Sequence, residues 1–302
     1  MNILVIKHGS LGDLVLSFGA IKTLRENYPN SNIYLLTQSN YKQIFKNLPY
    51  VNEILVDNRI SIFPSIKNIL KKVKEKKIDL LIDLQNSNRT EIYNLFIKIF
   101  TKCKILSARK FSDYSYRQKE LGIQHITKNH QDQLKYLKIN TYLKPDLNWM
   151  LKGNTKQSKK VIFIPGTSKS GEYKKWPSDK YAEVAKYLVS RNYEIYLTGS
   201  VMDINTINEI IKLCPDSKNK INESKIEDFY QLCMSSKLIL TNDTGPAHIA
   251  GLTNKNVIWL ANDNEISRSC YPLGNNLHKI TASNVKNISV NTIINKIEQI
   301  LK

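Results

Sequence analysis

Residues 1–13 read MNILVIKHGSLGD, and residues 159–172 read KKVIFIPGTSKSGE. Each stretch is an apolar, β-branched run that ends in a short loop containing Gly and Ser. A helical pattern follows, directly in the first case and after the insert 173–177 in the second. A buried strand, a glycine loop and a helix start open the α/β nucleotide-binding fold, and such loops bind anions because helix-terminal N–H groups point into them. The sequence therefore predicts two nucleotide-fold domains with the chemistry in the cleft between them.

Strand and helix patterns alternate through both halves of the chain, which is typical of parallel sheets with helices on both faces. The polar stretch 151–158 indicates a linker, and the basic, tyrosine-rich stretch 107–124 is expected to be a loop. We therefore predict an α/β chain with Rossmann-like domains over residues 1–152 and 158–288. The last residues, 289–302, are expected to form a helix that crosses back to the first domain. The strands predicted are 3–6, 32–36, 53–56, 78–84, 104–106, 161–164, 194–197, 238–240 and 257–260.

The charge of the chain is strongly positive. It carries 45 basic and 26 acidic residues, a net charge of +19, which can indicate a polyanionic partner. Only 7 of the basic residues are Arg, however, and the rest are Lys. Codon bias in an AT-rich genome explains such a lysine excess. Proteins that recognise nucleic acids usually rely on Arg. Residues 1–150 carry 24 basic and 12 acidic groups, net +12. This half could rest on an anionic membrane surface or hold an anionic acceptor, and a solvated lysine face explains it nearly as well.

The sequence contains no membrane or targeting signal that we recognise. No stretch approaches the ~20 apolar residues of a membrane span, and the run 3–6 is too short for the core of a signal peptide. The four cysteines form no C-x-x-C pair and fit no zinc spacing, so we expect free thiols in a reducing compartment. These features predict a cytosolic protein.

The first candidate site is the loop Gly9-Ser10-Leu11-Gly12-Asp13. It lacks G-x-G-x-x-G and so fails the dinucleotide fingerprint. Asp13 falls in a first helical turn, where the helix dipole favours a carboxylate by ~0.3–1 kcal/mol. On spacing alone this structural role explains the residue. A carboxylate at the mouth of a strand–loop–helix unit could also take a proton from a sugar hydroxyl.

The second candidate site is the loop PGTS at 165–168, followed by two lysines at 174–175. A glycine loop with the hydroxyls of Thr167 and Ser168 can hold phosphate oxygens through backbone N–H groups. A nearby lysine such as Lys174 would add a point charge. Adjacent lysines can be mere surface charge, but their place after a phosphate-type loop favours function.

The most specific motif is the stretch 240–248, LTNDTGPAH. An apolar strand ends in Asn-Asp, and Thr-Gly-Pro then opens a helix, where proline at the first position loses no hydrogen bond. Gly245 would let a ligand approach the backbone closely, and Thr244 with the open N–H groups predicts an anion pocket. His248 lies in the first turn beside that pocket. A lone histidine is more often structural, but one beside an anion site is a better candidate for binding.

A weaker signal is LTGS at 197–200 with Asp203 shortly after it. A glycine loop followed by an acid can accept hydrogen bonds from ribose hydroxyls, and Asp203 could equally cap the next helix. No two aspartates stand in a D-x-D arrangement. A diphosphate leaving group would therefore depend on lysine and helix N-termini rather than on a metal clamp.

Taken in this order, the motifs resemble glycosyltransferase family 9, the bacterial heptosyltransferases. The resemblance spans most of the chain and rests on G-S-L-G-D, on P-G-T with Y-K-K-W-P, on L-T-G-S-x-x-D and on N-D-T-G-P-x-H. It implies a GT-B fold, in which two Rossmann-like domains face each other across a central cleft. It also implies an inverting, metal-independent transfer of a sugar from a nucleotide diphosphate, typically ADP-heptose, to the inner core of lipopolysaccharide. The N-terminal domain would bind the acceptor and the C-terminal domain the nucleotide-sugar.

The resemblance also implies roles for individual residues. Asp13 matches the catalytic base, within the acceptor-side loop of Gly9, Ser10 and Gly12. Asp203 stands where an acidic residue contacts the ribose. The stretch 259–264 reads WLANDN where relatives often carry Phe-Gly-Pro-Thr, near the donor base or sugar. The residues that match the binding site for the donor sugar and its phosphates are Thr167, Ser168, Lys174, Asp243, Thr244, Gly245 and His248.

The resemblance implies no cofactor beyond the nucleotide-sugar substrate, no metal and no nucleic-acid partner. The acceptor would be a glycolipid or glycan, and the enzyme would be cytoplasmic, with peripheral contact with the inner membrane as an option. Two alternatives stay open. One is a nucleotide-sugar epimerase on the same fold, which needs no acceptor, and the other is a non-catalytic basic protein that binds a membrane surface or nucleic acid. The acceptor, the exact sugar, the base and the oligomeric state do not follow from the sequence.

Overall fold

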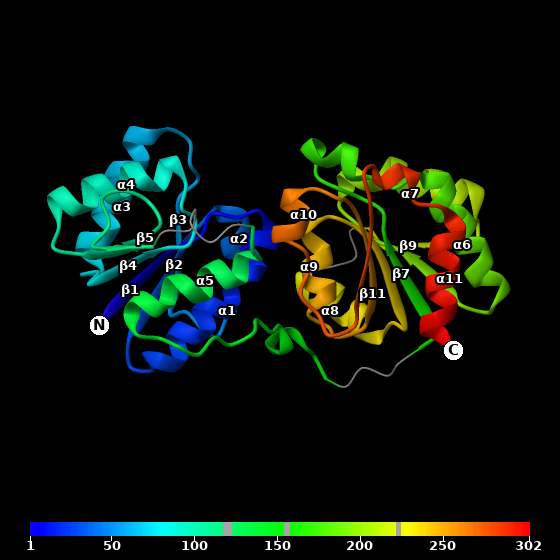
Figure 1. Cartoon of the computed structure of the whole chain (residues 1–302), viewed down its shortest axis with the longest axis horizontal. Coiled ribbons are helices and arrows are strands. Elements are labelled where there is room, and N and C mark those ends of the chain that lie inside the picture. Colours follow the sequence, from blue (N-terminus) through cyan, green and yellow to red (C-terminus); the bar gives the residue numbers. More distant parts are fainter. Residues whose placement is uncertain (117–122, 154–157, 222–224) are drawn as a thin grey trace. The chain divides into compact units, whose positions relative to one another are not determined.

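The computed structural model divides into two compact units, Met1–Trp149 and Met150–Lys302 (Figure 1). The division falls beside the predicted linker. Parts of that linker and of the predicted loop 107–124 lie outside the described residues. The residues that the structure describes are 1–116, 123–153, 158–221 and 225–302.

Unit 1 is built on a parallel sheet that, in the described residues, has six strands in the order β3-β2-β1-β4-β5-β6. In the Rossmann arrangement the sheet grows outward in two directions from the first strand, and the order reverses between β1 and β4. The main elements of this unit are β1 (Asn2–Ile6), α1 (Leu11–Asn27), β2 (Asn32–Thr37), α2 (Ser39–Ile44), β3 (Glu53–Val56), α3 (Ile62–Glu75), β4 (Leu80–Asp83), α4 (Asn88–Phe100), β5 (Lys104–Ser107), β6 (Tyr114–Ser115) and α5 (Ile126–Leu134).

Unit 2 repeats the same topology. Its described strands run in the order β12-β11-β10-β7-β8-β9, so β7 and β10 stand where β1 and β4 stand in unit 1. The main elements are β7 (Lys160–Ile164), α6 (Ser178–Ser190), β8 (Glu194–Leu197), α7 (Ile204–Leu213), β9 (Lys218–Asn219), α8 (Ile226–Ser235), β10 (Leu238–Asn242), α9 (Gly245–Gly251), β11 (Asn256–Asn262), α10 (Glu265–Ser269), β12 (Leu277–Ala282) and α11 (Val290–Leu301).

The predicted α/β class with two Rossmann-like sheets is confirmed. The central strands are paired on both sides and covered on both faces, which is why they appear in the sequence as unbroken apolar runs. In β1, Ile3, Leu4, Val5 and Ile6 are fully buried, and β1 pairs in parallel with both β2 and β4.

Three local expectations were wrong. The edge strand β12 was missed because its residues are only partly buried and show no continuous apolar run. The short strand β6 lies within the stretch expected to be a loop. A serine just before the helical pattern of residues 179–191 predicts an N-cap, but Ser178 is the first helical residue of α6, after Pro177, and its Oγ donates to Glu209 at 2.8 Å.

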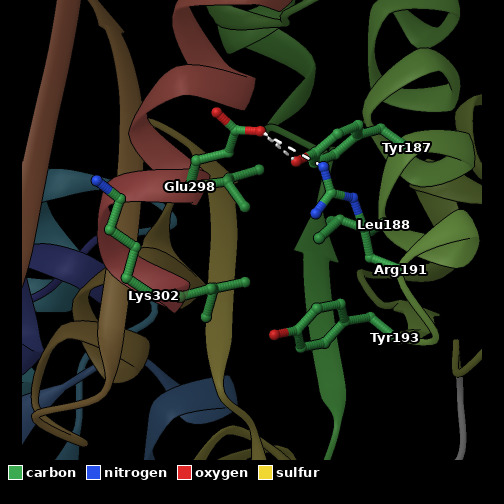
Figure 2. A pocket seen from close by; sticks show the side chains of 8 residues that line it. Tyr187, Leu188, Arg191, Tyr193, Glu298 and Lys302 are labelled. Atoms are coloured by element: carbon green, nitrogen blue, oxygen red, sulfur yellow. Dashed lines mark hydrogen bonds and ion pairs between the residues drawn. The ribbon is translucent and has the colours of Figure 1, made fainter.

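The last helix, α11, falls within unit 2. Its apolar face enters the core of unit 2, where Ile293 and Ile297 are buried beside α6. Next to this contact the Tyr187 hydroxyl of α6 donates to Glu298 Oε1 at 2.7 Å (Figure 2). Burial of this face within unit 2 explains the amphipathic pattern of the helix.

Candidate functional site

The predicted site residues gather at the carboxyl ends of the strands in each unit. In sheets of this order, ligands bind beyond those ends at the point where the strand order reverses. In unit 1 that point lies between β1 and β4, and the loop 9–13 follows β1 directly. In unit 2 it lies between β7 and β10, and these strands lead into the loop 165–168 and the stretch 243–248. The candidate base and the candidate phosphate-binding residues therefore occupy equivalent positions in the two units.

Asp13 lies in the first turn of α1 and is only half-buried. Its Oδ2 accepts hydrogen bonds from the Ser10 backbone N–H at 3.0 Å and from Ser10 Oγ at 3.2 Å. The structural role that spacing suggested is thus present. The same two bonds hold the carboxylate in one orientation, which is also what a catalytic base needs.

Position 9 needs glycine for two reasons, the backbone conformation there and a close contact with a neighbouring side chain. Its φ of +112° is a conformation that side-chain-bearing residues rarely adopt, and a Cβ there would stand 2.4 Å from Tyr41 Cε2. Burial raises the pKa of the Tyr41 hydroxyl, and the charge of Asp13 adds to that shift. Tyr41, which the sequence did not single out, therefore packs on the loop that carries Asp13.

A buried hydrogen-bond network behind this loop was not predicted from the sequence. His8, the residue before the loop, is fully buried, and its Nε2 lies 3.0 Å from Asp57 Oδ2. The hydroxyl of Tyr93 donates to the same oxygen at 2.7 Å, and Ser65 Oγ and the Arg59 N–H donate to Oδ1 at 3.0 Å each. Burial alone would raise the pKa of Asp57, but these hydrogen bonds hold it well below its usual range. The network ties β3 and α4 to the end of β1.

Acid should therefore destabilise the wild-type protein more than an Asp57→Asn variant. An unfolded aspartate has a pKa of about 3.9, and the folded pKa of Asp57 is lower. Between these two values the unfolded state binds the extra proton, so the stabilisation is present above about pH 4 and is lost as the pH falls further. Urea unfolding at pH 5 and pH 3 measures the difference. Equal losses of unfolding free energy in both proteins would contradict the assignment.

In unit 2 the structure brings Lys174 and Asp243 together. Lys174 Nζ lies 2.6 Å from Asp243 Oδ2, and the two side chains are 22% and 13% exposed. Burial acts to lower the pKa of Lys174, but the carboxylate of Asp243 outweighs it and raises that pKa. The adjacent Lys175 pairs instead with Glu172 at 2.7 Å. Of the two adjacent lysines, only Lys174 is placed over the end of β10.

Asn242, the last residue of β10, joins several segments at the carboxyl edge of the sheet in unit 2. This role was not predicted from the sequence. It is fully buried, and its Nδ2 donates to the Pro165 carbonyl at 2.6 Å. Its Oδ1 accepts from the Trp176 backbone N–H at 3.2 Å and from the Tyr181 hydroxyl at 3.0 Å. One side chain thus joins the 165–168 loop, the segment after Lys174 and helix α6.

Replacing Asn242 by alanine should lower the free energy of unfolding by about 3 kcal/mol, because a buried carbonyl, N–H and hydroxyl would each lose a partner. Chemical denaturation monitors the change. Tyr181→Phe removes only one of these bonds and should cost about 1 kcal/mol. If Asn242→Ala is no less stable than Tyr181→Phe, Asn242 does not have the proposed structural role.

The remaining predicted residues are distributed around the same edge of unit 2. Thr167 is buried, whereas Ser168 is exposed and its Oγ lies 3.3 Å from Ser170 Oγ. Thr244 is the N-cap of the short helix α9, which starts at Gly245 with a proline in its first turn. His248 is buried within α9.

The Asp203 side chain has a structural role in the loop after β8. It is 5% exposed, and its Oδ2 accepts from the Ser200 backbone N–H and from Ser200 Oγ at 2.8 Å each. A Cβ on Gly166 would stand 2.1 Å from Asp203 Cγ, so the glycine loop after β7 packs directly on this carboxylate. Asp203 is the N-cap residue of α7 by position, but its side chain makes no capping bond to that helix and closes the turn from Ser200 instead. Asp203 also supports the 165–168 loop.

The titratable groups of the described residues do not assemble into a metal centre. Within the described ranges, no group of three or more His, Cys, Asp or Glu side chains is arranged to hold a metal ion. The chemistry that the described groups can supply is a half-buried carboxylate in unit 1 and a lysine beside a glycine loop in unit 2.

Two sheets of Rossmann order, each carrying polar groups at its switch point, define a GT-B-like α/β fold. The model of glycosyltransferase family 9 (heptosyltransferase) matches residues 66–287, and the chain belongs to this family.

Curated relatives are similar over most of their length. The chain is 23% identical to lipopolysaccharide heptosyltransferase 2 of Salmonella typhimurium, over 86% of this chain and 82% of that protein. It is 26% identical to lipooligosaccharide heptosyltransferase 2 of Haemophilus influenzae, over 86% and 83%. The solved structure of the E. coli ADP-heptose LPS heptosyltransferase II superposes with a TM-score of 0.78 at 21% identity, covering 100% of this chain and 98% of that one.

Proposed function

We propose that this glycosyltransferase moves a heptose from ADP-heptose to a lipopolysaccharide core or a related surface glycan. Family membership and the names of the relatives support the sugar and the acceptor class. The observation that carries the proposal for this chain is the Lys174–Asp243 pair over the end of β10. It places a partly exposed cation at the sheet edge that also carries the glycine loop 165–168, and such a cation can stabilise the charge of a nucleotide diphosphate.

The residues of unit 2 would bind the donor. Lys174 neutralises the charge that develops on the departing diphosphate, and the hydroxyls of Ser168 and Thr244 would donate to phosphate oxygens. The buried Thr167 hydroxyl, which donates to the Ser168 carbonyl at 3.3 Å, would have to turn from that bond to join them. Asp243 holds Lys174 in place before the donor arrives and can then accept a hydrogen bond from the sugar. We further propose that His248 and Gly245 line the same donor site, and that Asp203 reaches the ribose in addition to its structural role.

The residues of unit 1 would activate the acceptor. Asp13 takes the proton from the acceptor hydroxyl, which then attacks the anomeric carbon on the face opposite the nucleotide, so the configuration inverts. The loop of Gly9, Ser10 and Gly12 orients the carboxylate. Proton nuclear magnetic resonance of the new glycosidic bond tests the stereochemistry, and a product with the donor's anomeric configuration would overturn it.

The transfer is proposed to need no metal, because Lys174 can supply the charge that Mg²⁺ supplies elsewhere. Turnover should then persist at full rate in EDTA. A loss of turnover that Mg²⁺ restores would contradict this part of the proposal.

Nucleotide binding gives the most direct test of the proposed donor. ADP at 100 times its dissociation constant should stabilise the folded protein by about 2.7 kcal/mol. The expected result is a larger rise in melting temperature with ADP than with UDP or GDP. A larger rise with UDP or GDP than with ADP would exclude ADP-heptose as the preferred donor.

The epimerase alternative differs in its need for an acceptor. An epimerase would convert the nucleotide-sugar when incubated with it alone, whereas the proposed transferase should leave the sugar unchanged until an acceptor is added. The protein is proposed to act in the cytoplasm, where the nucleotide-sugar would be available. Fractionation of cells expressing a tagged chain tests this location.

A further inference from the structure

Two large apolar side chains are exposed at the start of α3, one in the turn that precedes the helix and one in its first turn. Ile60 is 88% exposed and Phe63 is 77% exposed, the two highest fractions among the large hydrophobic residues that the structure describes. Exposed apolar side chains are common singly, but two so close together in the chain indicate a contact surface.

The turn is held in place rather than left loose. The Arg59 N–H donates to Asp57 Oδ1 at 3.0 Å, and Arg89 Nη2 donates to the Arg59 carbonyl at 3.2 Å. Arg89 Nη1 also donates to the Tyr93 hydroxyl at 3.0 Å. The apolar pair is therefore presented by the same hydrogen-bond network that ends at His8, the residue before the Asp13 loop.

Lysines continue this surface along α3. Phe63, Lys67, Lys71 and Lys74 recur at helical spacing, so they share one face of the helix. All four are exposed, whereas residues on the opposite face pack into the core of unit 1. Figure 1 shows α3 beside α4 in unit 1, in agreement with the contacts between these two helices.

The charge on this face is almost entirely positive. The acidic residue in α3 is Glu75, whose Oε1 lies 3.7 Å from Lys71 Nζ, with both side chains more than half exposed. Such an exposed pair contributes little, so most of the positive charge on the helix is left for a partner. An aromatic and an aliphatic tip beside a lysine row is the chemistry that an anionic bilayer surface accepts.

We propose that Ile60, Phe63, Lys67, Lys71 and Lys74, the α3 surface, dock unit 1 on a bilayer that contains anionic lipid. The lysines lie against the headgroups, and the two apolar tips enter the interface. Among the described residues no helix is long and apolar enough to cross a membrane. The inference rests on the proposed function, because a glycolipid acceptor would lie in that bilayer. Ile60 and the first turn of α3, with Phe63, follow β3 at the carboxyl edge of the sheet, the edge that also carries Asp13.

Vesicle co-sedimentation of the full chain tests the inference. Wild-type protein should bind vesicles of 30% phosphatidylglycerol in phosphatidylcholine, should bind pure phosphatidylcholine far more weakly, and should be released by salt. Each lysine near the surface contributes about fivefold to partitioning, so Lys67→Gln with Lys71→Gln and Lys74→Gln should weaken binding about 100-fold. Ile60→Ser with Phe63→Ser should weaken it about tenfold or more.

Matched controls come from unit 2, where Lys186, Lys212 and Leu213 are also exposed. Lys186→Gln with Lys212→Gln, and Leu213→Ser, should leave vesicle binding within about twofold of the wild type, because none of these residues belongs to the α3 surface. If these controls lose binding as much as the α3 variants do, binding is a general charge effect and the proposal is overturned. It is also overturned if wild-type protein ignores the anionic vesicles or if the α3 variants bind them normally.

A second measurement separates this inference from the proposed function. The ADP-induced rise in melting temperature should be the same in the α3 variants as in the wild type, because none of the substituted residues lies in unit 2. Lost vesicle binding with a retained ADP response supports docking through α3. A wild-type protein that binds vesicles but shows no response to ADP would instead contradict the proposed donor while leaving the α3 surface supported.

Discussion

Replacing Asp13 by asparagine should reduce turnover about 10²–10⁴-fold and leave the melting temperature close to that of the wild type. The amide oxygen of asparagine can still accept the Ser10 N–H that now bonds to Asp13 Oδ2. The amide cannot take a proton from an acceptor hydroxyl. The substitution therefore removes the proposed chemistry and keeps the hydrogen bond at the start of α1. Initial rates with saturating donor and acceptor, together with a melting curve, measure both effects.

Two further variants separate the base from the cap. Asp13→Ala should lose as much activity as Asp13→Asn and also about 1 kcal/mol of stability, because it removes the bond to the N-cap residue. Ser10→Ala removes the Oγ contact at 3.2 Å but keeps the carboxylate, and should retain most of the activity. An Asp13→Asn enzyme with near-normal turnover would show that the base is another group.

Replacing Lys174 by methionine should reduce kcat/KM for the donor about 10²–10³-fold. The substitution removes the cation that is proposed to bind the diphosphate. It also leaves the Asp243 carboxylate, which in the wild type lies 2.6 Å from Lys174 Nζ, without its partner. An unpaired carboxylate would also repel the incoming phosphates. Steady-state kinetics with varied donor concentration would show the loss, and the ADP-induced rise in melting temperature should shrink in parallel.

The neighbouring lysine provides the control. Lys175 has the same side chain, adjoins Lys174 in sequence and pairs with Glu172 rather than with Asp243. Lys175→Met should therefore change kcat/KM for the donor by less than about threefold, because its partner Glu172 is exposed and lies away from Asp243. Equal losses in the two variants would mean that general positive charge, and not the position over β10, serves the donor.

The fold class and the loops that carry the site were predictable because their signals are local. An apolar β-branched run ending in a glycine loop predicts a central strand at any position in a chain, and both such runs became central strands. The edge strand β12 and the short strand β6 were not predictable in this way, since partial burial removes the apolar run on which the prediction depends.

The amino-acid sequence by itself determined the two-unit α/β architecture, the family and the segments in which candidate residues lie, because each depends on residue order within a short stretch. Only the tertiary structure decided which side chains meet. Lys174 reaches Asp243 across 69 positions, His8 reaches Asp57 across 49, and Asn242 reaches the Pro165 carbonyl across 77. The same holds for α11, whose apolar stripe could not indicate which unit would bury it. These pairings follow from the order of the strands in each sheet, which brings the carboxyl ends of distant strands to one edge. Local sequence periodicity does not predict that order.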